Sequence, residues 1–558
     1  MAGNLLSAAT KGLRPYLALT VLCAAIFLPG LASIPPIDRD EARYMQASKQ
    51  MLESGNYVDI TFQDEPRNKK PVGIYWLQVL AVKASAVKDL SATWPYRLPS
   101  VLGAWLAVLA TFHFGRAYFT PGIALAGAAM LATSLIVVVE AHIAKTDAAL
   151  LAAVTLSMLI LARFYTRDPE RMPSVWAALL FWVVLGTGIL IKGPLILLVV
   201  GVSVIALCIA DRRINWVKSL HPEFGVPVAA AVVLPWLLAT SVSGGGSFLS
   251  DAFTQDLLPK LTGGQESHGS PSGMHLLALL ATAWPWSLLA PFALMYAWKN
   301  RGEKFVRFCL AWIIPSWIIF ELVPTKLPHY TMPLFPALML LSAACVLKNE
   351  RIENAKLRAA GAAFKILWAI ASLGLAGAIV WAAGMYGAAG LPVYISAAAA
   401  LAAGVVGAWS AVKNSPRTTG ALFASSIVFS LFTFGGAVPG LERLAVSTQL
   451  ADIVAPLKSE NTRVAVAGFH EPSAVFLLGT HTWLTSWDGA TGLLINKEVS
   501  IIAVPEENIA DIKIELGKHD LEMRTQGIAK GRNYSKGEDV KLVVVTAAPI
   551  TRPEGGGE

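Results

Sequence analysis

The chain has little charge and little cysteine for its length. Only 15% of its 558 residues are Asp, Glu, Lys or Arg, and it has four cysteines. The mean hydropathy of +0.56 excludes an ordinary soluble protein. Because Cys23, Cys208, Cys309 and Cys345 all lie in or beside apolar segments, a disulfide framework is not expected, and they are interpreted as small core residues.

Long apolar runs make up most of the chain. Runs of about 18 or more residues predict transmembrane helices, and about thirteen are expected. The first run could be a secretory signal, but the acidic cluster directly behind it favours an uncleaved anchor. The runs carry almost no charge near their centres, which argues against a proton-coupled transporter, since transporters place ionisable groups near the bilayer midplane. The expected spans are 16–34, 98–118, 121–140, 147–164, 174–191, 194–210, 226–242, 273–297, 305–323, 329–347, 364–383, 391–411 and 420–438.

The positions of Lys and Arg predict how the chain is oriented in the membrane. Alternate loops are basic, and these loops should share the cytoplasmic side together with the N-terminus. Segment 35–97, loop 243–272 and the region after residue 440 then lie on the outer side. The net charge of +8 is explained by these loops and implies no nucleic acid. The basic loops are 163–171, 212–218, 299–307 and 348–358.

Two domains are expected. Residues 1–440 form a transmembrane α-helical domain, whose first outer loop, 35–97, carries an interfacial helix at 72–82. Residues 441–558 have the composition of a small soluble α/β domain with a disordered tail. The strands expected in this domain are 463–469, 499–505 and 541–549, and its expected helices are 447–458 and 505–518.

Charged residues that could carry chemistry follow the first span. Asp40, Glu41 and Arg43 lie in the sequence IDRDEARYMQA. Carboxylates can bind a metal ion, accept a proton, or hold a sugar hydroxyl or amine. The alternative is that the acids cap the N-terminus of a helix, where the helix dipole favours them.

Basic residues occur further along the same loop. Lys69, Lys70 and Tyr75 lie in NKKPVGIYW, on the side that the positive-inside preference disfavours for lysine. Lysine is a compact partner for phosphate, so these residues are candidates for binding a phosphate group. The alternative is that the lysines extend to lipid headgroups.

Two short outer loops carry further candidates. HIAKTDAAL contains Lys145 and Asp147, and PTKLPHYTMPLFP contains Lys326, His329 and Tyr330. Asp147 is a candidate for a second site carboxylate on the same side as Asp40. Lys326, His329 and Tyr330 together suit a site for phosphate and sugar, and the prolines around them suit a loop of fixed shape. Asp147 could instead cap the helix that follows it.

Weaker candidates are also predicted on the outer side. Lys192 follows an apolar run, and His268 lies in the loop 243–272. Glu140 is interpreted as an interfacial residue at a helix end. In the C-terminal domain, GFHEPS could reach the site through His470 or Glu471, but a structural turn is the favoured interpretation.

Together these segments resemble the polyprenyl-phosphate-dependent glycosyltransferases of the C-type membrane superfamily, which are related to protein O-mannosyltransferases. The most similar branch is the bacterial 4-amino-4-deoxy-L-arabinose lipid A transferases. The resemblance covers nearly the whole chain, and its most specific part is TKLPHY. The matching segments are DEARY (40–44), KPVGIYW (70–76), AKTDAAL (144–150), LIKGP (190–194), TKLPHYTMPLFPAL (325–338) and GFHEPSAVFLLG (468–479).

The resemblance implies roles for individual residues. Asp40 and Asp147 would be the site carboxylates, and Lys70 would be linked to the carrier phosphate or the acceptor. Family members often have Glu immediately before that lysine, where this chain has Lys69. His268 followed by glycine is also similar to the family. No cofactor is required by the resemblance: the site carboxylates could orient the sugar, hold its amine or bind a divalent metal ion, and such an ion would be held by Asp40, Glu41 and His268.

The resemblance also implies a reaction. A sugar, best matched by 4-amino-4-deoxy-L-arabinose, would pass with inversion from undecaprenyl phosphate to lipid A or lipopolysaccharide, at the periplasmic face of the inner membrane. Lys70, Lys326, Arg43 and Lys192 would stabilise the leaving phosphate. A phosphate acceptor needs no general base, whereas a hydroxyl acceptor would need one Asp as base. The alternatives are galacturonosyl, hexosyl or protein O-glycosyl transfer and, in another class, a flippase for a lipid-linked sugar.

Overall fold

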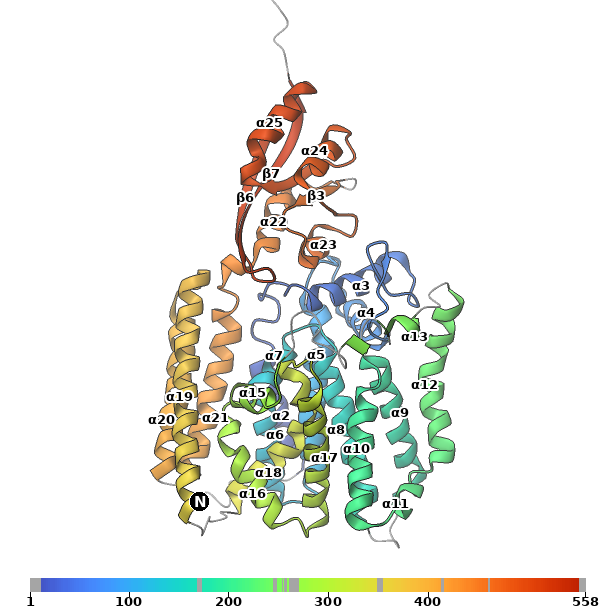
Figure 1. The fold of residues 1–558 in the computed structure, drawn as a ribbon, viewed down its shortest axis with the longest axis vertical. Helices are drawn as coiled ribbons and strands as arrows, with labels where there is room; N and C mark the ends of the chain where they lie inside the picture. The colour runs from blue at the N-terminus through green and yellow to red at the C-terminus, as the bar shows by residue number, and fades with distance from the viewer. Residues whose placement is uncertain are drawn as a thin grey trace, which may run out of the picture.

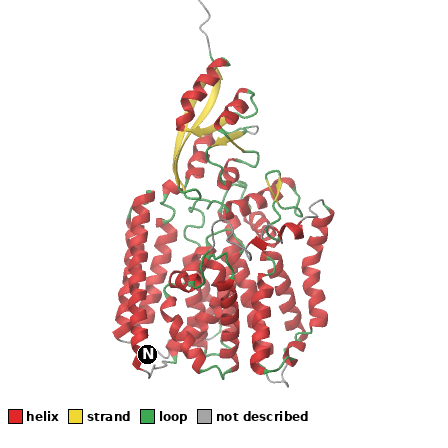
Figure 2. Ribbon diagram, viewed as in Figure 1, coloured by secondary structure: helices red, strands yellow, loops and turns green. Residues whose placement is uncertain are grey.

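The fold is described from a computed structural model. The described residues are 12–167, 173–243, 248–252, 254, 258–259, 270–348, 355–412, 416–459 and 462–550. Helices make up nearly all of the lower, larger part, and most of the strands lie in a small domain above it (Figure 2). The end of the helical part that faces this small domain is called the upper end below (Figure 1).

The transmembrane part follows the predicted apolar runs. Within the described ranges, nine helices are long and apolar enough to span a membrane, or ten if the bent pair α6–α7 counts as one. The fold is therefore that of a polytopic α-helical membrane protein. The helices of this part are α2 (Arg14–Phe27), α5 (Trp94–Gly115), α6 (Pro121–Ala132), α7 (Leu135–Ala141), α8 (Asp147–Thr166), α9 (Val175–Lys192), α10 (Leu195–Asp211), α11 (Asn215–Lys218), α12 (Pro222–Val242), α13 (Phe248–Asp251), α15 (Met274–Thr282), η4 (Trp286–Leu289), α16 (Ala290–Lys299), α17 (Lys304–Leu322), η5 (Pro328–Leu334), α18 (Phe335–Leu347), α19 (Ala355–Tyr386), α20 (Leu391–Val412), α21 (Pro416–Phe432) and η6 (Thr433–Ala437).

The predicted count of thirteen spans is not confirmed. The runs at 16–34 and 194–210 form helices of 14 and 17 residues, which are short for a span. The run at 273–297 is divided into α15, η4 and α16. The break contains Pro285, which has no backbone N–H to continue the ladder of helical hydrogen bonds.

The bend between α6 and α7 has a local cause. The two helices meet at 58°. At the break, the hydroxyls of Thr133 and Ser134 donate to backbone carbonyls one turn earlier, those of Ala129 and Met130. The backbone N–H of Leu135 donates to the carbonyl of Trp284 and not to a carbonyl of its own helix. The bend lies just before the loop that carries Lys145.

The first loop forms a layer over the upper end of the helices (Figure 1). It contains α3 (Asp40–Ser54), the short antiparallel pair β1 (Thr61–Phe62) and β2 (Glu65–Pro66), and α4 (Gly73–Ser85). The helix predicted at 72–82 is α4. Its Trp76, Leu77 and Leu80 are exposed, as expected of an apolar face turned toward a bilayer interface.

The C-terminal domain is a five-stranded mixed sheet of order β4-β3-β5-β7-β6. Strands β4, β3 and β5 are parallel, and β7 and β6 are antiparallel to their neighbours. Helices α22 and α23 pack on one face and α24 and α25 on the other. The elements are η7 (Glu442–Leu444), α22 (Val446–Val454), η8 (Ala455–Leu457), β3 (Val464–Ala467), α23 (Pro472–Leu478), β4 (Trp483–Thr485), α24 (Trp487–Ile495), β5 (Ile501–Pro505), η9 (Glu506–Asn508), α25 (Ile509–Lys518), β6 (Leu521–Asn533) and β7 (Glu538–Pro549).

The three predicted strands of this domain are confirmed as β3, β5 and β7, and the two predicted helices as α22 and α25. Strand β6 was not predicted, because it is mostly exposed and polar and contains Gly527 and Gly531. Gly531 is required by close packing, since a Cβ there would lie 2.1 Å from the carbonyl oxygen of Arg443. The structure describes the chain up to residue 550, so the disordered tail predicted at the C-terminus lies outside the described residues.

Candidate functional site

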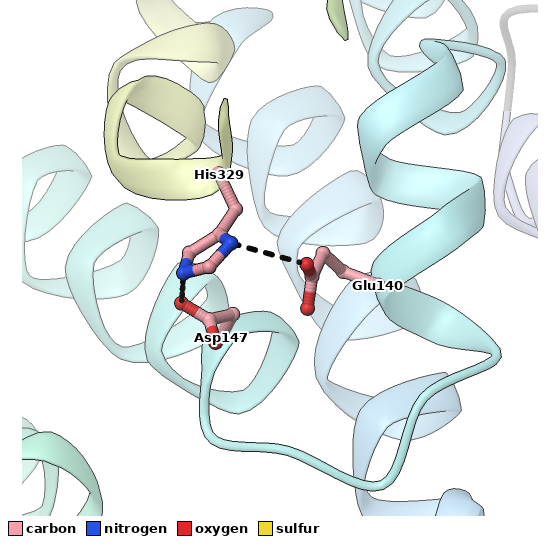
Figure 3. Close-up of side chains that lie close together, drawn as sticks. All are labelled: Glu140, Asp147 and His329. Carbon is pink, nitrogen blue, oxygen red and sulfur yellow. Dashed lines mark ion pairs between the residues drawn. The ribbon is translucent and has the colours of Figure 1, made fainter. Parts of the chain in front are cut away.

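Five ionisable side chains meet at the upper end of the helices. Asp147 is the first residue of α8 and Lys192 is the last of α9, so each lies at the helix end whose dipole favours its charge. Glu140 comes from α7, Lys145 from the loop before α8, and His329 from η5. Figure 3 shows His329 between the two acids. These five residues are called the charge cluster below.

The contacts in the charge cluster are close. Lys192 Nζ is ion-paired with Asp147 Oδ1, and Lys145 Nζ lies 3.2 Å from Glu140 Oε1 and 3.9 Å from Asp147 Oδ2. The two ring nitrogens of His329 lie 3.5 Å from Glu140 and 3.4 Å from Asp147. Both acids are almost wholly buried. Interactions between these charges are therefore screened less than they would be in water.

Lys145 lies between the acids of two loops. Burial alone would lower the pKa of Lys145, but the charges of Glu140, Asp147 and Asp40 outweigh it and hold that pKa well above its usual value. Asp40, from the first loop, is therefore within electrostatic reach of the charge cluster. The two acidic motifs predicted from the sequence are brought to one site.

The charge cluster could offer three ligands to a metal ion. Ligand atoms of Glu140, Asp147 and His329 all lie within 4.8 Å of one another. The ammonium groups of Lys145 and Lys192 already balance the two carboxylates, however. A divalent cation would have to enter beside two positive charges, so these residues do not fit a resident metal, and the reaction below includes no metal step.

Asp40 and Glu41 are neighbours in very different surroundings. Asp40 begins α3 and is exposed, and no hydrogen bond or ion pair is found for its carboxylate among the described residues. Glu41 is buried and forms a bidentate ion pair with Arg97 at 2.8 and 3.0 Å. Its oxygens also accept from the backbone N–H groups of Ile37 and Ala144.

This environment weighs against the metal-binding role that was expected of Glu41. The carboxylate has four donors, which use its lone pairs, and it is shielded from substrate. Arg97 in turn donates its remaining N–H groups to the carbonyls of Leu31, Ile34 and Pro35. We therefore assign Glu41 a structural role. The other expected metal ligand, His268, lies outside the described residues.

Arg67 is bound by two tyrosines near Asp40. Its guanidinium lies 5.3 Å from the ring of Tyr44, and its Nε donates to the hydroxyl of Tyr75 at 3.3 Å. Burial and neighbouring Tyr75 raise the pKa of Tyr44, and the charges of Asp40 and Asp147 add to that rise. The charges of both acidic motifs therefore reach Tyr44, and Tyr75 is hydrogen-bonded to Arg67 beside it. The phosphate-binding role expected of Tyr75 stays a prediction.

Lys69 and Lys70 follow Arg67 closely in the chain, and Arg43 lies on α3. Lys69, Lys70 and Arg43 are all half-buried. Asn68, beside the lysines, donates to Asp251 of α13 at 2.9 Å. The loop is thereby attached to the segment that follows α12.

The side chains of the loop after α17 have different roles: some lie at the charge cluster and one binds the loop backbone. The ring of Tyr330 lies 5.7 Å from Lys192 Nζ and stacks on His275, so Tyr330 adjoins the charge cluster to which its neighbour His329 belongs. Lys326 is buried and donates to the backbone carbonyls of Ser270 and Val323, each at 2.8 Å. Lys326 therefore secures the loop.

Three contributors were missed by sequence reasoning. Glu140 was interpreted as interfacial, although its position seven residues before Asp147, across a short loop, would have allowed both to face one site. Arg67 and Arg97 were not singled out. An arginine on the disfavoured side of the membrane, two residues before the lysine pair, was the available indication for Arg67.

The sequence model of the dolichyl-phosphate-mannose-protein mannosyltransferase family matches residues 16–243. An undecaprenyl phosphate-alpha-4-amino-4-deoxy-L-arabinose arabinosyl transferase of Pseudomonas paraeruginosa is 30% identical over 60% of this chain and 59% of its own length. Transferase 1 of that name from Pseudomonas fluorescens is 28% identical over 60% of this chain and 58% of its own. The matches thus span somewhat more than half of these relatives.

Solved structures extend the likeness to the whole fold. The crystal structure of ArnT from Cupriavidus metallidurans bound to undecaprenyl phosphate has a TM-score of 0.73 and 18% sequence identity, and the match covers 98% of this chain and 100% of that one. The same protein in the apo state gives a TM-score of 0.70. The resemblance that the motifs indicated is therefore confirmed.

Proposed function

From its C-type membrane glycosyltransferase fold and its likeness to aminoarabinose transferases, we propose that this chain transfers 4-amino-4-deoxy-L-arabinose from undecaprenyl phosphate to lipid A or lipopolysaccharide. The protein is a multi-pass membrane protein. In this proposal it lies in the bacterial inner membrane with its N-terminus in the cytoplasm, and the charge cluster and the sheet domain are periplasmic. The transmembrane domain, 1–440, carries the reaction, and 441–558 lies above it.

The observation that carries the proposal is the gathering of Asp40 and the charge cluster at one end of the spans. Two carboxylates from separate loops, with lysines beside them, suit a reaction in which a sugar leaves one phosphate and joins another. A transporter would instead need ionisable groups along a path through the bilayer. The likeness to transferases with this donor lipid supports the choice of donor.

The chemistry requires stabilisation of a leaving phosphate. The bond between the anomeric carbon and the carrier phosphate breaks, and its electrons stay on the phosphate oxygen. Lys70 and Arg67, on the loop beside the site, would stabilise that charge, with Lys69 and Arg43 near them. A lipid A phosphate oxygen, already ionised, would attack the anomeric carbon from the opposite face, so no general base is needed.

The carboxylates would then orient the sugar. Asp147 is held by Lys192 and Lys145, which fixes its oxygens without a rearrangement during the reaction. Glu140 Oε2 is buried and has no hydrogen-bond partner among the described residues. A buried oxygen of this kind is costly unless a donor reaches it, and the ammonium group of an amino sugar would supply one. Asp40, exposed at the end of α3, would contact the sugar or acceptor from the other side.

A second candidate sugar is an acid such as galacturonic acid. Lys69 stands where related proteins often have glutamate, so the loop from Arg67 to Lys70 carries three positive charges within four residues. Such a loop favours a carboxylate in the donor sugar, whereas Glu140 favours an amine. The two candidates therefore predict different products.

Mass spectrometry of lipid A and the lipopolysaccharide core tests the proposal. Cells with the wild-type protein, without it, and with Asp147→Asn are compared at matched membrane levels of protein. We expect an added mass of an aminopentose that the variant abolishes. An added hexuronic acid would select the second candidate. Movement of a lipid-linked sugar across the membrane with no new product in any fraction would contradict a transferase.

A further inference from the structure

The sheet domain contacts the residues immediately before Asp40. The long hairpin of β6 and β7 runs down from the domain to the upper end of the helices (Figure 1). At its turn, the Tyr534 hydroxyl accepts from the backbone N–H of Asp38, and the carbonyl of Ser535 accepts from Arg39 Nη2 at 2.8 Å. The side chain of Asp38 accepts from the N–H of Ser473 at 3.1 Å.

The turn that makes these contacts is itself held in place. Asn533 is buried and donates to Glu471 Oε1 at 2.9 Å, just before α23. The side-chain oxygen of Asn533 also accepts from the N–H of Ser535. Since a buried and satisfied polar network fixes one geometry, the turn presents Tyr534 and Ser535 in a defined position.

The backbone that the turn holds is strained. Arg39 has φ 67° and ψ −97°, in a region that residues other than glycine rarely adopt. Such a conformation persists only when its surroundings impose it, and strain of this kind is commonly found beside functional groups. Asp40 is the next residue, so the direction in which its carboxylate leaves the loop depends on this backbone.

The domain also secures the remainder of α3. Lys49 donates to the carbonyl of Phe476 at 2.9 Å and lies 5.4 Å from its ring. Gln46 donates to Thr480 at 2.8 Å, and Thr480 donates to Glu53. Contacts at both ends of α3 therefore fix the whole helix against the sheet domain. The β6–β7 turn holds the residues Asp38 and Arg39 immediately before the helix.

We propose that the β6–β7 turn is a positioning element of the transfer reaction, with Tyr534 and Ser535 holding Asp38 and Arg39 so that Asp40 keeps its place at the site. This inference rests on the proposed function and adds a role for the C-terminal domain. Tyr534 is a positioning residue, since it acts through the loop and does not touch substrate.

Tyr534→Phe in the full-length protein tests the inference, because it keeps the ring and removes only the hydroxyl. Lys536→Ala is the matched control, since Lys536 is an exposed side chain of the same turn. Hydrogen exchange of the peptide covering residues 36–42 is measured alongside steady-state transfer kinetics. We expect faster exchange in that peptide and a kcat lower by about 10- to 100-fold, with KM for the donor lipid nearly unchanged. Exchange in β7 should stay at the wild-type level.

Two results would overturn the positioning role. One is a Tyr534→Phe protein with wild-type exchange at 36–42; the other is faster exchange with an unchanged kcat. If Lys536→Ala lowers kcat equally, the effect belongs to the turn's fold and the specific role of Tyr534 fails. A wild-type protein with no transfer activity would overturn the proposed function, and the exchange result would still decide whether the turn holds the loop.

Discussion

The two acidic motifs of the site differ in how their carboxylates are buried and paired. In the first motif, Asp40 is exposed and Glu41 is buried against Arg97. In the second, Glu140 and Asp147 are both buried and share Lys145 and His329, and Lys192 pairs with Asp147. The first motif separates an exposed acid, which is proposed to act on the substrate, from a structural one, whereas the second keeps both acids in a balanced group.

This difference shows that adjacency in sequence is a poor guide to role. Asp40 and Glu41 differ by one position in a helix, which turns them about 100° apart, so one faces the protein and the other faces solvent. Glu140 and Asp147 are separated by a loop and come together. If the comparison is right, substitutions in the two motifs will affect activity and stability differently.

Asp147→Asn should have the largest effect on activity. The substitution removes the charge that Lys145 and Lys192 balance, so the site loses an oriented carboxylate and gains an excess of positive charge. We expect transfer to fall by about 10²- to 10³-fold. Lys192→Met provides the reciprocal test, and a double variant should lose much less than the sum of the two. Strict additivity in transfer kinetics would show that the ion pair does not act as a unit.

Glu41→Ala should have the largest effect on stability. It leaves the buried guanidinium of Arg97 without its partner, which typically costs about 3–5 kcal/mol. A lower melting temperature in detergent and lower membrane levels are expected. Arg97→Ala should behave alike, since it leaves a buried carboxylate. A Glu41→Ala protein that melts normally but is inactive would instead give Glu41 a direct role in the reaction.

Asp40→Asn should separate the two properties. Because the Asp40 side chain is exposed, the melting temperature should change by less than about 2 °C, within the range of most surface substitutions. Transfer should fall by about 10- to 100-fold, since Asp40 is proposed to contact the same sugar or acceptor as the charge cluster. Near-normal turnover would remove Asp40 from the site.

The smallest effect concerns Asp38, whose carboxylate accepts a hydrogen bond from the N–H of Ser473. Burial raises the pKa of Asp38 to about 7, with Glu471 adding to the rise and Ser473 and Arg43 opposing it. Because the folded pKa lies above the unfolded one, protonated Asp38 stabilises the contact with the sheet domain below about pH 4, and this contribution is lost as the pH rises through 7. The protection factors of residues 36–42, which are corrected for the intrinsic pH dependence of amide exchange, should therefore fall as the pH rises from about 4 to 7. Asp38→Asn should remove that dependence, and a slope that persists would assign it to another group.

Much of the fold was predictable because apolar runs and buried strands follow from local sequence. The strands at 464–467 and 501–505 are continuous apolar runs. Strand β6 is largely polar and forms by pairing with another strand, so its local sequence gives little indication of a strand. The site was predictable in part. Asp40, Asp147 and Lys192 lie at helix ends that sequence can locate.

Other features of the site depend on tertiary contacts. The burial of Glu41 requires Arg97, 56 positions away, and the role of Lys326 is set by carbonyls that happen to lie within reach. The spacing of Glu140 and Asp147 allowed both to face one site, but only the bend between α6 and α7 and the packing of η5 bring Glu140 against Asp147 and His329. Sequence reasoning therefore identified most of the participants and could not assign which of them are structural.

The pairing of Glu41 with Arg97 also has a consequence for biosynthesis. The Arg97 side chain donates to the carboxylate of Glu41 and to the backbone carbonyls of Leu31, Ile34 and Pro35. All four of these residues precede Arg97 in the chain. No residue after Arg97 is needed to close this network, so it can form once α5 is in the bilayer, independently of the packing of the segment with Asp147. The later N–H of Ala144 then docks on a carboxylate already in place, so the first hundred residues act as a template on which the nascent second loop is built.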